Sequence, residues 1–136
     1  MALKVYCDTN IFIDYLDERE DNIRPLQEFA FIFFSRGWNC AFKLIISDWL
    51  LDELRRHLTE EQINRVLNNF KEKDKLIFIK EALGDRQKAR NISKHWDDAL
   101  HAILANKANA DYLATRNLKH YENCHNLVNI RLPESI

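Results

Sequence analysis

Short apolar segments alternate with amphipathic stretches along the whole chain. Segments rich in β-branched and aromatic residues predict five strands, at residues 3–7, 42–46, 75–79, 112–114 and 127–131. Between these segments, apolar residues recur at helical spacing. Strands that alternate with helices are typical of a parallel sheet, so the pattern predicts an α/β domain.

Local signals indicate where the helices begin and end. Ser47 and Thr59 each precede a periodic stretch and predict N-caps. Pro25 suits the first turn of a helix that Gly37 is expected to end. The predicted helices cover residues 11–16, 25–36, 48–58, 60–70, 82–93 and 97–108, with an acidic loop at 17–22.

The composition fits one globular domain spanning residues 1–136. A chain of 136 residues that is 46% hydrophobic and 30% charged can bury a core, and its 2 glycines and 2 prolines mark no linker. The 3 cysteines are widely spaced and odd in number, which favours reduced thiols and a cytoplasmic location. No segment is long and apolar enough to span a bilayer, so we expect no membrane partner.

Charge is distributed unevenly, although the net charge is only −1. Residues 1–28 contain 7 acidic and 3 basic residues, whereas residues 71–94 contain 8 basic and 4 acidic ones. A basic sector beside an acidic cleft suits a polyanion that is held by its phosphates and cut at a metal site. The alternative is a solvated helix face, which is what most charge runs are.

Asp8 is the first candidate for a functional residue. It follows the apolar segment 3–7 and precedes an amphipathic stretch, which places it at the carboxyl end of a strand. Ligands of open α/β sheets bind outside the carboxyl ends of the strands. The Asp8 carboxylate is therefore expected to point into a cleft.

Glu53 is distinguished from its acidic neighbours by helical geometry. It falls at the edge of the apolar arc of its helix, whereas Asp48 suits the first turn, where the helix dipole favours an acid. A carboxylate at the rim of a buried face needs a cation, an arginine or a metal ion as partner. An ordinary boundary glutamate paired with a base is the alternative.

Asp98 lies at the start of a helix that is apolar on nearly all sides. It shares one face with Ala102 and Ala105, whose small side chains allow close packing against a neighbour. We therefore expect Asp98 at the entrance of a packing seam. Asp97 lies on another face, with His101, and is interpreted as the helix N-cap.

Thr115 and Asn117 follow the predicted strand 112–114, just as Asp8 follows the first strand. This placement would bring a hydroxyl and an amide to the same edge of the sheet. A polar turn without a chemical role is the alternative.

Together, four segments resemble the PIN-domain ribonucleases in their order and approximate spacing. Each segment is short, but four in register over nearly the whole chain form a fairly specific signal. The segments are Val5-Tyr6-Cys7-Asp8-Thr9-Asn10-Ile11-Phe12, the helix from Ser47 to Leu54 that carries Glu53, Asp98-Ala99-Leu100-His101-Ala102-Ile103-Leu104-Ala105, and Ala110-Asp111-Tyr112-Leu113-Ala114-Thr115-Arg116-Asn117.

The resemblance implies a fold and a set of site residues. The fold is a three-layer α/β/α sandwich around a five-stranded parallel sheet. Asp8, Glu53 and Asp98 are implied as the metal ligands, with Asn117 in the family's fourth acidic position. An amide oxygen brings no charge, so the question whether the site binds one or two metal ions stays open. Thr9 and Thr115 would hold the acids by hydrogen bonds.

The implied activity is metal-dependent hydrolysis of RNA phosphodiester bonds. Clustered carboxylates without histidine or cysteine select hard divalent ions, so Mg²⁺ or Mn²⁺ is expected as the cofactor and Zn²⁺ is not. Such an ion would lower the pKa of a bound water for attack on phosphorus. None of the site residues would itself be the nucleophile.

Relatives of this size are often toxins of the VapC type, which implies an antitoxin partner and a homodimer. Phe29, Phe31, Phe33 and Phe34 lie in the predicted helix 25–36 and are too many for one buried stripe. We expect the surplus to pack either on the helix after Thr59 or on another chain.

Two other classes of function stay open. A catalytically inactive PIN-like module that binds RNA or protein would keep the fold, and Asn117 in place of a fourth acid supports it. A phosphatase of the haloacid dehalogenase type also begins with a strand that ends in Asp. That fold requires a second acid two residues later, where this chain has Asn10.

Overall fold

A five-stranded parallel sheet forms the centre of the molecule. The computed structural model describes residues 3–16 and 25–136, and the acidic loop predicted at 17–22 lies outside them. The strand order is β3-β2-β1-β4-β5, and each pair of neighbours is parallel. The strands are β1 Leu3–Cys7, β2 Phe42–Ser47, β3 Leu76–Ile79, β4 Tyr112–Ala114 and β5 Ile130–Arg131.

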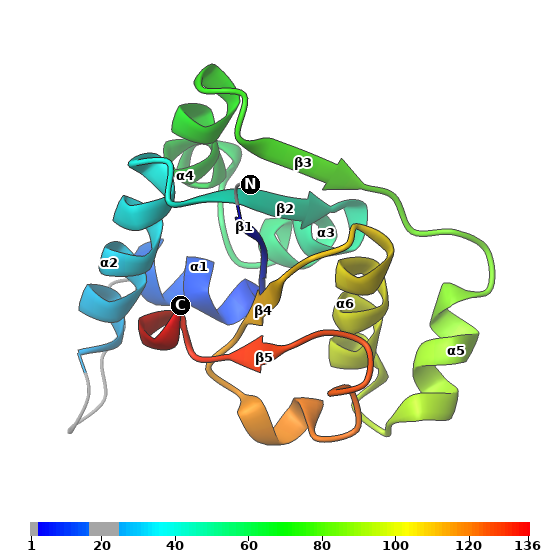
Figure 1. Cartoon of the computed structure of the whole chain (residues 1–136). Coiled ribbons are helices and arrows are strands. Elements are labelled where there is room, and N and C mark those ends of the chain that lie inside the picture. The colour runs from blue at the N-terminus through cyan, green and yellow to red at the C-terminus, as the bar shows by residue number, and fades with distance from the viewer. Residues whose placement is uncertain (1–2, 17–24) are drawn as a thin grey trace.

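Helices cover both faces of the sheet, which confirms the predicted three-layer α/β/α sandwich. Figure 1 shows α1, α2 and α4 on one side of the sheet and α5 and α6 on the other. The helices are α1 Thr9–Leu16, α2 Leu26–Trp38, α3 Asp48–Arg55, α4 Glu60–Glu72, α5 Asp85–Ile92 and α6 Trp96–Lys107, with short 3₁₀ helices η1 Leu118–Tyr121 and η2 Pro133–Ser135.

The two cores follow from the alternation of side chains along the central strand β1. Val5 and Cys7 are fully buried in the core made with α1, α2, α3 and α4. Tyr6, between them, is fully buried in the core made with α5 and α6. A strand segment with both faces covered must be apolar, which explains the run Val5–Cys7, whereas Leu3 and Lys4 at the start of the strand are exposed and partly exposed.

The topology places Asp8 at the position where such sheets bind ligands. From β1 the chain continues to β2 and β3 on one side, and β4 and β5 lie on the other, so the order reverses between β1 and β4. The backbone N–H of Asp8 donates to the carbonyl of Ala114, the last residue of β4, at 2.9 Å. Residues that follow β1 and β4 therefore meet at one edge of the sheet.

The N-caps predicted at Ser47 and Thr59 are confirmed. The Ser47 hydroxyl accepts from the backbone N–H of Leu50, and Thr59 forms a capping box with Gln62. Other predicted ends are displaced. The helix after β3 begins at Asp85 because Gly84 precedes it in a left-handed conformation, with φ at 91°.

Among the described helices, none combines the length and the apolar character that crossing a membrane requires.

Gly37 does not end α2, contrary to the prediction, because it serves close packing instead. The helix continues through Trp38, and Gly37 is buried. A Cβ atom at this position would lie 2.6 Å from the ring of Phe70 and 2.8 Å from that of Phe42. The glycine thus lets α2 approach α4 and β2 more closely than any other residue would allow.

We predict that Gly37→Ala destabilises the protein. The overpacked rings should cost about 1–3 kcal/mol, which exceeds the gain of about 1 kcal/mol that alanine brings to an exposed helix position. Urea unfolding measures the difference. The double variant Gly37→Ala, Phe70→Leu should recover part of the loss, because leucine vacates the clashing volume. A Gly37→Ala protein at least as stable as the wild type would contradict this account of the packing.

Candidate active site

Asp8 is a buried carboxylate whose oxygens are held on several sides. Its side chain is only 3% exposed. Oδ2 accepts from the hydroxyls of Thr115 at 2.8 Å and Tyr121 at 2.9 Å, and from the side-chain amide of Asn10 at 3.2 Å. Oδ1 accepts from the backbone N–H of Thr9 at 2.7 Å. These donors fix the position of the carboxylate in the fold.

Glu53 reaches the same place from the last turn of α3. The cap at Ser47 starts this helix directly after β2, so the helix rises from the same sheet edge. Glu53 Oε1 accepts from the Thr9 hydroxyl at 2.8 Å and from Nε2 of His101 in a very short hydrogen bond. Burial acts to raise the pKa of Glu53, but the hydrogen bond and the charge of His101 outweigh it and leave this pKa below its usual value.

His101 lies at the centre of the acidic cluster. Its side chain is fully buried on α6, and Nε2 lies 3.8 Å from Asp8 Oδ1. Nδ1 lies 2.7 Å from the Tyr6 hydroxyl, which in turn lies 2.6 Å from the Ser47 hydroxyl. Because the Glu53 carboxylate only accepts hydrogen bonds, Nε2 of His101 must carry a proton.

The carboxylates around His101 raise its pKa. Burial alone would lower this pKa, but the hydrogen bond to Glu53 and the charges of Asp8, Glu53 and Asp98 reverse the direction. The charges of all three predicted acids therefore act on the pKa of His101. The prediction that no histidine belongs to the cluster is wrong.

Asp98 borders this cluster and joins a second one. Its Oδ2 lies 2.9 Å from Nδ1 of His120 on η1. Burial, followed by the charges of Asp8 and Asp97, raises the pKa of Asp98 to about 6. Burial is the larger cause, and the neighbouring carboxylates act in the same direction.

The three predicted acids therefore converge but do not form one equivalent set. Asp8, Glu53 and His101 each place a potential ligand atom within 4.8 Å of the others, and Asp98 does so with His95 and His120. Asp98 is connected to the first group through the influence of Asp8 on its pKa. Within the described residues, the site consists of Asp8 and Glu53 grouped with His101, and of Asp98 in a neighbouring group with His95 and His120.

Asp97 is not the N-cap of α6, contrary to the prediction. The cap position is His95, and Asp97 is an exposed residue in the first turn. Its backbone carbonyl accepts from the indole N–H of Trp49 at 3.1 Å. The helix begins earlier than expected, where Trp96 packs against Trp49 with ring centroids 5.6 Å apart.

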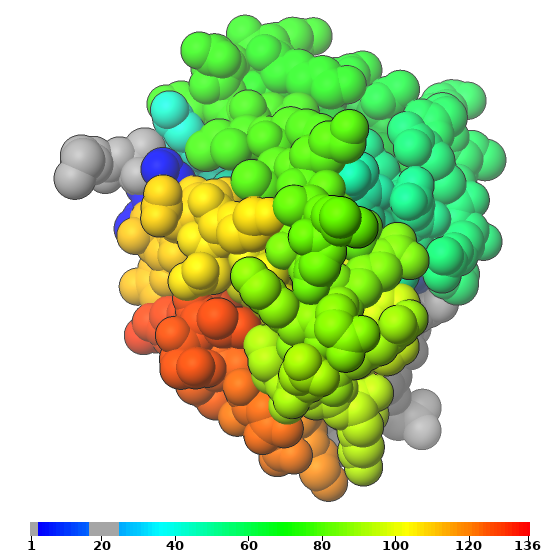
Figure 2. Space-filling model, turned by 90° about the vertical axis from the view of Figure 1, so that its right-hand side faces the viewer, coloured from blue at the N-terminus to red at the C-terminus, as the bar shows by residue number. Residues whose placement is uncertain are grey.

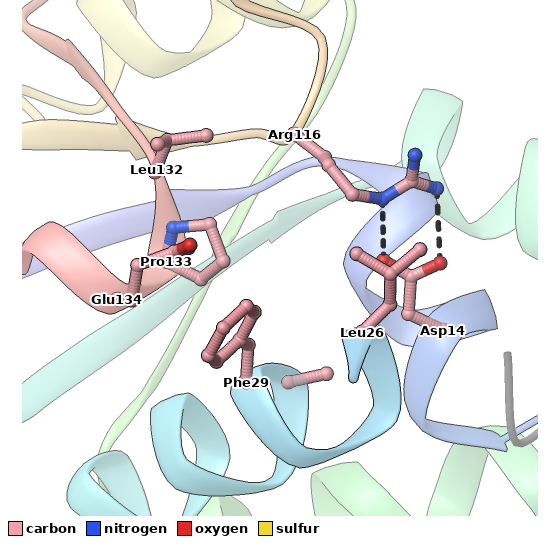
Figure 3. A pocket seen from close by; sticks show the side chains of 8 residues that line it. Asp14, Leu26, Phe29, Arg116, Leu132, Pro133 and Glu134 are labelled. Carbon is pink, nitrogen blue, oxygen red and sulfur yellow. Dashed lines mark hydrogen bonds and ion pairs between the residues drawn. The ribbon is translucent and has the colours of Figure 1, made fainter. Parts of the chain in front are cut away.

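The loop after β4 is held by its own side chains. The buried Thr115 hydroxyl donates to Asp8 and accepts from the backbone N–H of Asn117 at 3.1 Å. Arg116 forms a two-point ion pair with the buried Asp14 of α1, at 2.6 and 2.9 Å (Figure 3). The Asn117 side chain makes no hydrogen bond to the acids in the described part of the chain, so only its backbone is tied to the site.

An apolar crevice next to this ion pair is not a substrate site. It lies between α2 and the C-terminal residues and is lined by Leu26, Phe29 and Pro133 as well as by Arg116 and Asp14 (Figure 3). Its space of about 10 Å³ holds roughly one water molecule. None of the acids of the cluster lines it.

The donor set fits a hard divalent ion. Carboxylate oxygens are the ligands that Mg²⁺ and Mn²⁺ prefer. Burial and the charges of neighbouring carboxylates raise the pKa of Asp98, and a bound cation would favour its ionised form. The Asp8 carboxylate is already held in place by its hydrogen bonds, so little ordering is needed to bind an ion.

Known proteins resemble the chain in sequence pattern and in fold. A family model described as PIN domain matches residues 4–119. No curated protein matches the sequence significantly. Two solved structures share the fold at low identity. One is VapBC2 from Rickettsia felis bound to a DNA fragment from the VapBC2 promoter, with a TM-score of 0.61 and 19% identity over 96% of this chain and 98% of that chain. The other is FitAB bound to an IR36 DNA fragment, with a TM-score of 0.59 and 14% identity over 97% of this chain and 96% of that chain.

Asp98 should give the metal-free protein a distinctive dependence of stability on pH. The folded protein keeps the Asp98 proton up to about pH 6, whereas the unfolded chain loses it near the ordinary pKa of 3.8. The folded state therefore binds more protons between these values, and the stability that Asp98 contributes falls as pH rises through this window. The loss is on the order of 2–3 kcal/mol.

Urea unfolding in EDTA between pH 4 and 7 tests this point. Asp98→Asn should remove the decline and be more stable than the wild type at pH 7, while Asp97→Asn, on the exposed side of the same turn, should retain most of it. If the free energy of unfolding changed with pH in the same way for the wild type and Asp98→Asn, the raised pKa of Asp98 would be contradicted.

Proposed function

This chain belongs to the PIN domain family, and from that premise we propose that it is a divalent-metal-dependent ribonuclease, the toxin of a toxin–antitoxin pair. The observation that carries the proposal is the buried group of Asp8, Glu53 and His101 at the carboxyl edge of the sheet, with Asp98 near enough for its charge to act on His101. Asp8 directly follows β1, Glu53 lies on α3 and Asp98 lies on α6, so only the fold brings them together. Carboxylates gathered at this edge suit metal-assisted hydrolysis of a phosphodiester.

We assign Asp8, Glu53 and Asp98 as ligands of Mg²⁺ or Mn²⁺, direct or through water. When bound, the ion lowers the pKa of a coordinated water and screens the charge that develops on phosphorus. Thr115 and Tyr121 hold Asp8, and Thr9 holds Glu53, through the hydrogen bonds described above. Asn117 lies beside Thr115 and would orient a water or ligate a weaker second ion.

His101 acts as the counter-charge of the acidic pocket. Its Nε2 proton bonds Glu53 and offsets part of the repulsion between the carboxylates. With a cation bound beside the carboxylates, its charge would lower the pKa of His101. Metal binding is therefore expected to release protons.

A ladder of arginine and tryptophan side chains beside the pocket suits RNA. In this ladder, Arg56 lies 5.7 Å from the ring centroid of Trp49, and Arg90 lies 5.0 Å from that of Trp96. Arg86 lies between the two rings, at 5.0 and 6.0 Å. The exposed α5, yellow-green in Figure 2, supplies two of these arginines from the basic sector of residues 71–94.

The position of the ladder connects it to the site. Arg56 helps to lower the pKa of Glu53, and the Trp49 ring centroid lies 6.1 Å from that of His101. Guanidinium groups stacked on aromatic rings contact both phosphates and bases of single-stranded nucleic acid. We therefore place the RNA backbone along this ladder, next to the acidic pocket.

The proposed partners are an antitoxin and a second copy of this chain. The two solved structures similar in fold carry the names of paired proteins, VapBC2 and FitAB, bound to DNA. On α2, Phe33 and Phe34 are buried in the core, whereas Phe31 and Ile32 are 48% and 46% exposed. These two side chains are the part of the aromatic helix left for another chain.

A binding module without activity is the second candidate. Two observations favour it. The Glu53 carboxylate is already hydrogen-bonded to His101, and the Asn117 side chain forms no hydrogen bond with the acids in the described structure. The two candidates differ in calorimetric titration with Mn²⁺. The nuclease requires affinity for the ion that depends on Asp8 and Asp98, whereas the binding module does not.

We predict that Asp8→Asn keeps the fold but reduces Mn²⁺-dependent cleavage of RNA by at least about 100-fold, because the amide removes a charged ligand. Cleavage of a labelled single-stranded RNA measures the effect, and circular dichroism checks the fold. Asp97→Asn serves as the matched control because Asp97 is exposed and outside the cluster. Equal cleavage by Asp8→Asn and the wild type would refute the assignment.

Removing a ladder arginine should weaken RNA binding in a salt-dependent way. Arg56→Gln and Arg90→Gln, made in the Asp8→Asn background to prevent cleavage, should each reduce the slope of log K against log salt by about 0.7. Fluorescence anisotropy with single-stranded RNA measures the slope. Arg65→Gln, on α4 in the opposite layer, should leave it unchanged. An effect of Arg65→Gln as large as that of Arg90→Gln would show that the ladder is not the binding surface.

A further inference from the structure

A second group of ligand atoms lies beside the first and shares only Asp98 with the proposed reaction. It consists of His95, Asp98 and His120, whose potential ligand atoms lie within 4.8 Å of one another. His95 is the N-cap residue of α6, Asp98 lies in the first turn of that helix, and His120 comes from η1. Two segments that are distant in sequence thus supply one cluster.

The geometry of this cluster is close to that of a metal site. Nδ1 of His120 and Oδ2 of Asp98 are 2.9 Å apart with a proton between them. Nitrogen and oxygen ligands about 2.0–2.1 Å from a tetrahedral ion are roughly 3.3 Å apart, so an ion can replace that proton with a small shift. The rings of His95 and His120 are stacked, with centroids 4.0 Å apart and planes at 8°. Because the lone pairs of an imidazole lie in its ring plane, one ring must rotate before both histidines can bind the same ion.

The cluster is open to ions from solvent. His95 and His120 line a surface hollow of about 360 Å³, together with Glu122. The His120 side chain is 42% exposed. In Figure 2 the yellow-green segment at the end of α5 lies against the orange segment that contains η1, and the hollow lies between residues of these two segments. Of the basic residues at its rim, Arg90 is engaged over Trp96.

We propose that His95, Asp98 and His120 form a binding site for a transition metal ion of the Zn²⁺ class, distinct from the carboxylate pocket for Mg²⁺ or Mn²⁺. Two imidazoles and one carboxylate suit Zn²⁺, whereas a pocket of carboxylates suits the harder ions. His95, His120 and Glu122 all line the hollow, so water or Glu122 would be available to such an ion as a fourth ligand.

Asp98 belongs to both sites, so the two ions compete for it. An ion held by His95 and His120 draws the Asp98 carboxylate away from Asp8 and Glu53. If the proposed nuclease activity holds, Zn²⁺ therefore inhibits Mg²⁺-dependent cleavage, and His95→Gln relieves the inhibition. This second statement rests on the proposed function, whereas the existence of the site does not.

Calorimetric titration of the metal-free full chain with Zn²⁺, in the absence of RNA, tests the site directly. His95→Gln and His120→Gln should each weaken the affinity by at least about tenfold, since even partners outside the first coordination shell contribute 10- to 100-fold to metal affinity. His57→Gln and His125→Gln, both at exposed positions outside the cluster, should bind like the wild type. Asp8→Asn should also retain Zn²⁺ affinity.

Thermal unfolding gives an independent readout that does not depend on activity. Zn²⁺ should raise the melting temperature of the wild type and of Asp8→Asn, but not of the two cluster variants, because only binding to the folded state stabilises it. Wild-type Zn²⁺ affinity in both His95→Gln and His120→Gln would overturn the proposal. So would a loss confined to Asp8→Asn, because it would place the ion in the carboxylate pocket. A ribonuclease test that fails while these results hold would reject the nuclease alone.

Discussion

The fixed position of the buried Asp8 carboxylate is the constraint on which the site depends. Burying a charge costs several kcal/mol, and hydrogen bonds to charged groups return about 1.5–3 kcal/mol each. The donors to Asp8 come from the start of α1, from the loop after β4 and from η1, so three segments must be in place to stabilise one carboxylate. The ion pair between Arg116 and Asp14 fastens the loop to α1 from the other side. The sheet edge is thereby organised around the Asp8 carboxylate.

The charge of the pocket has a second consequence. The carboxylates of Asp8, Glu53 and Asp98 repel one another, and two histidines form hydrogen bonds with them. His101 is buried against Glu53, and His120 bonds Asp98 near the surface. Burial and the charges of Asp8 and Asp97 nevertheless raise the pKa of Asp98. In the proposed metal site a cation would favour the ionised form of Asp98, whereas the metal-free protein retains the cost of burying this carboxyl group.

Much of the fold could be predicted from the sequence because its signals are local. Asp8 directly follows an apolar strand, and Ser47 and Thr59 cap helices through neighbouring backbone groups. The histidines could not be found in this way, since His101 meets Glu53 across 48 residues and His120 meets Asp98 across 22. The spacing of three residues between Asp98 and His101 on one helix was the only available signal. Tertiary packing also explains the errors at Gly37, which accommodates two aromatic rings, and at Asp97, where the contact between Trp49 and Trp96 accompanies an earlier helix start.

The central claim is that one hard ion binds between Asp8, which follows β1, and the acids of α3 and α6. The most direct measurement is the anomalous difference density of a crystal soaked in Mn²⁺, because the position of the peak identifies the ligands. We expect a peak within coordination distance of Asp8 and Glu53, with Asp98 bound directly or through water and Nε2 of His101 released from Glu53. A peak away from Asp8, or none at a saturating concentration of Mn²⁺, would contradict the account.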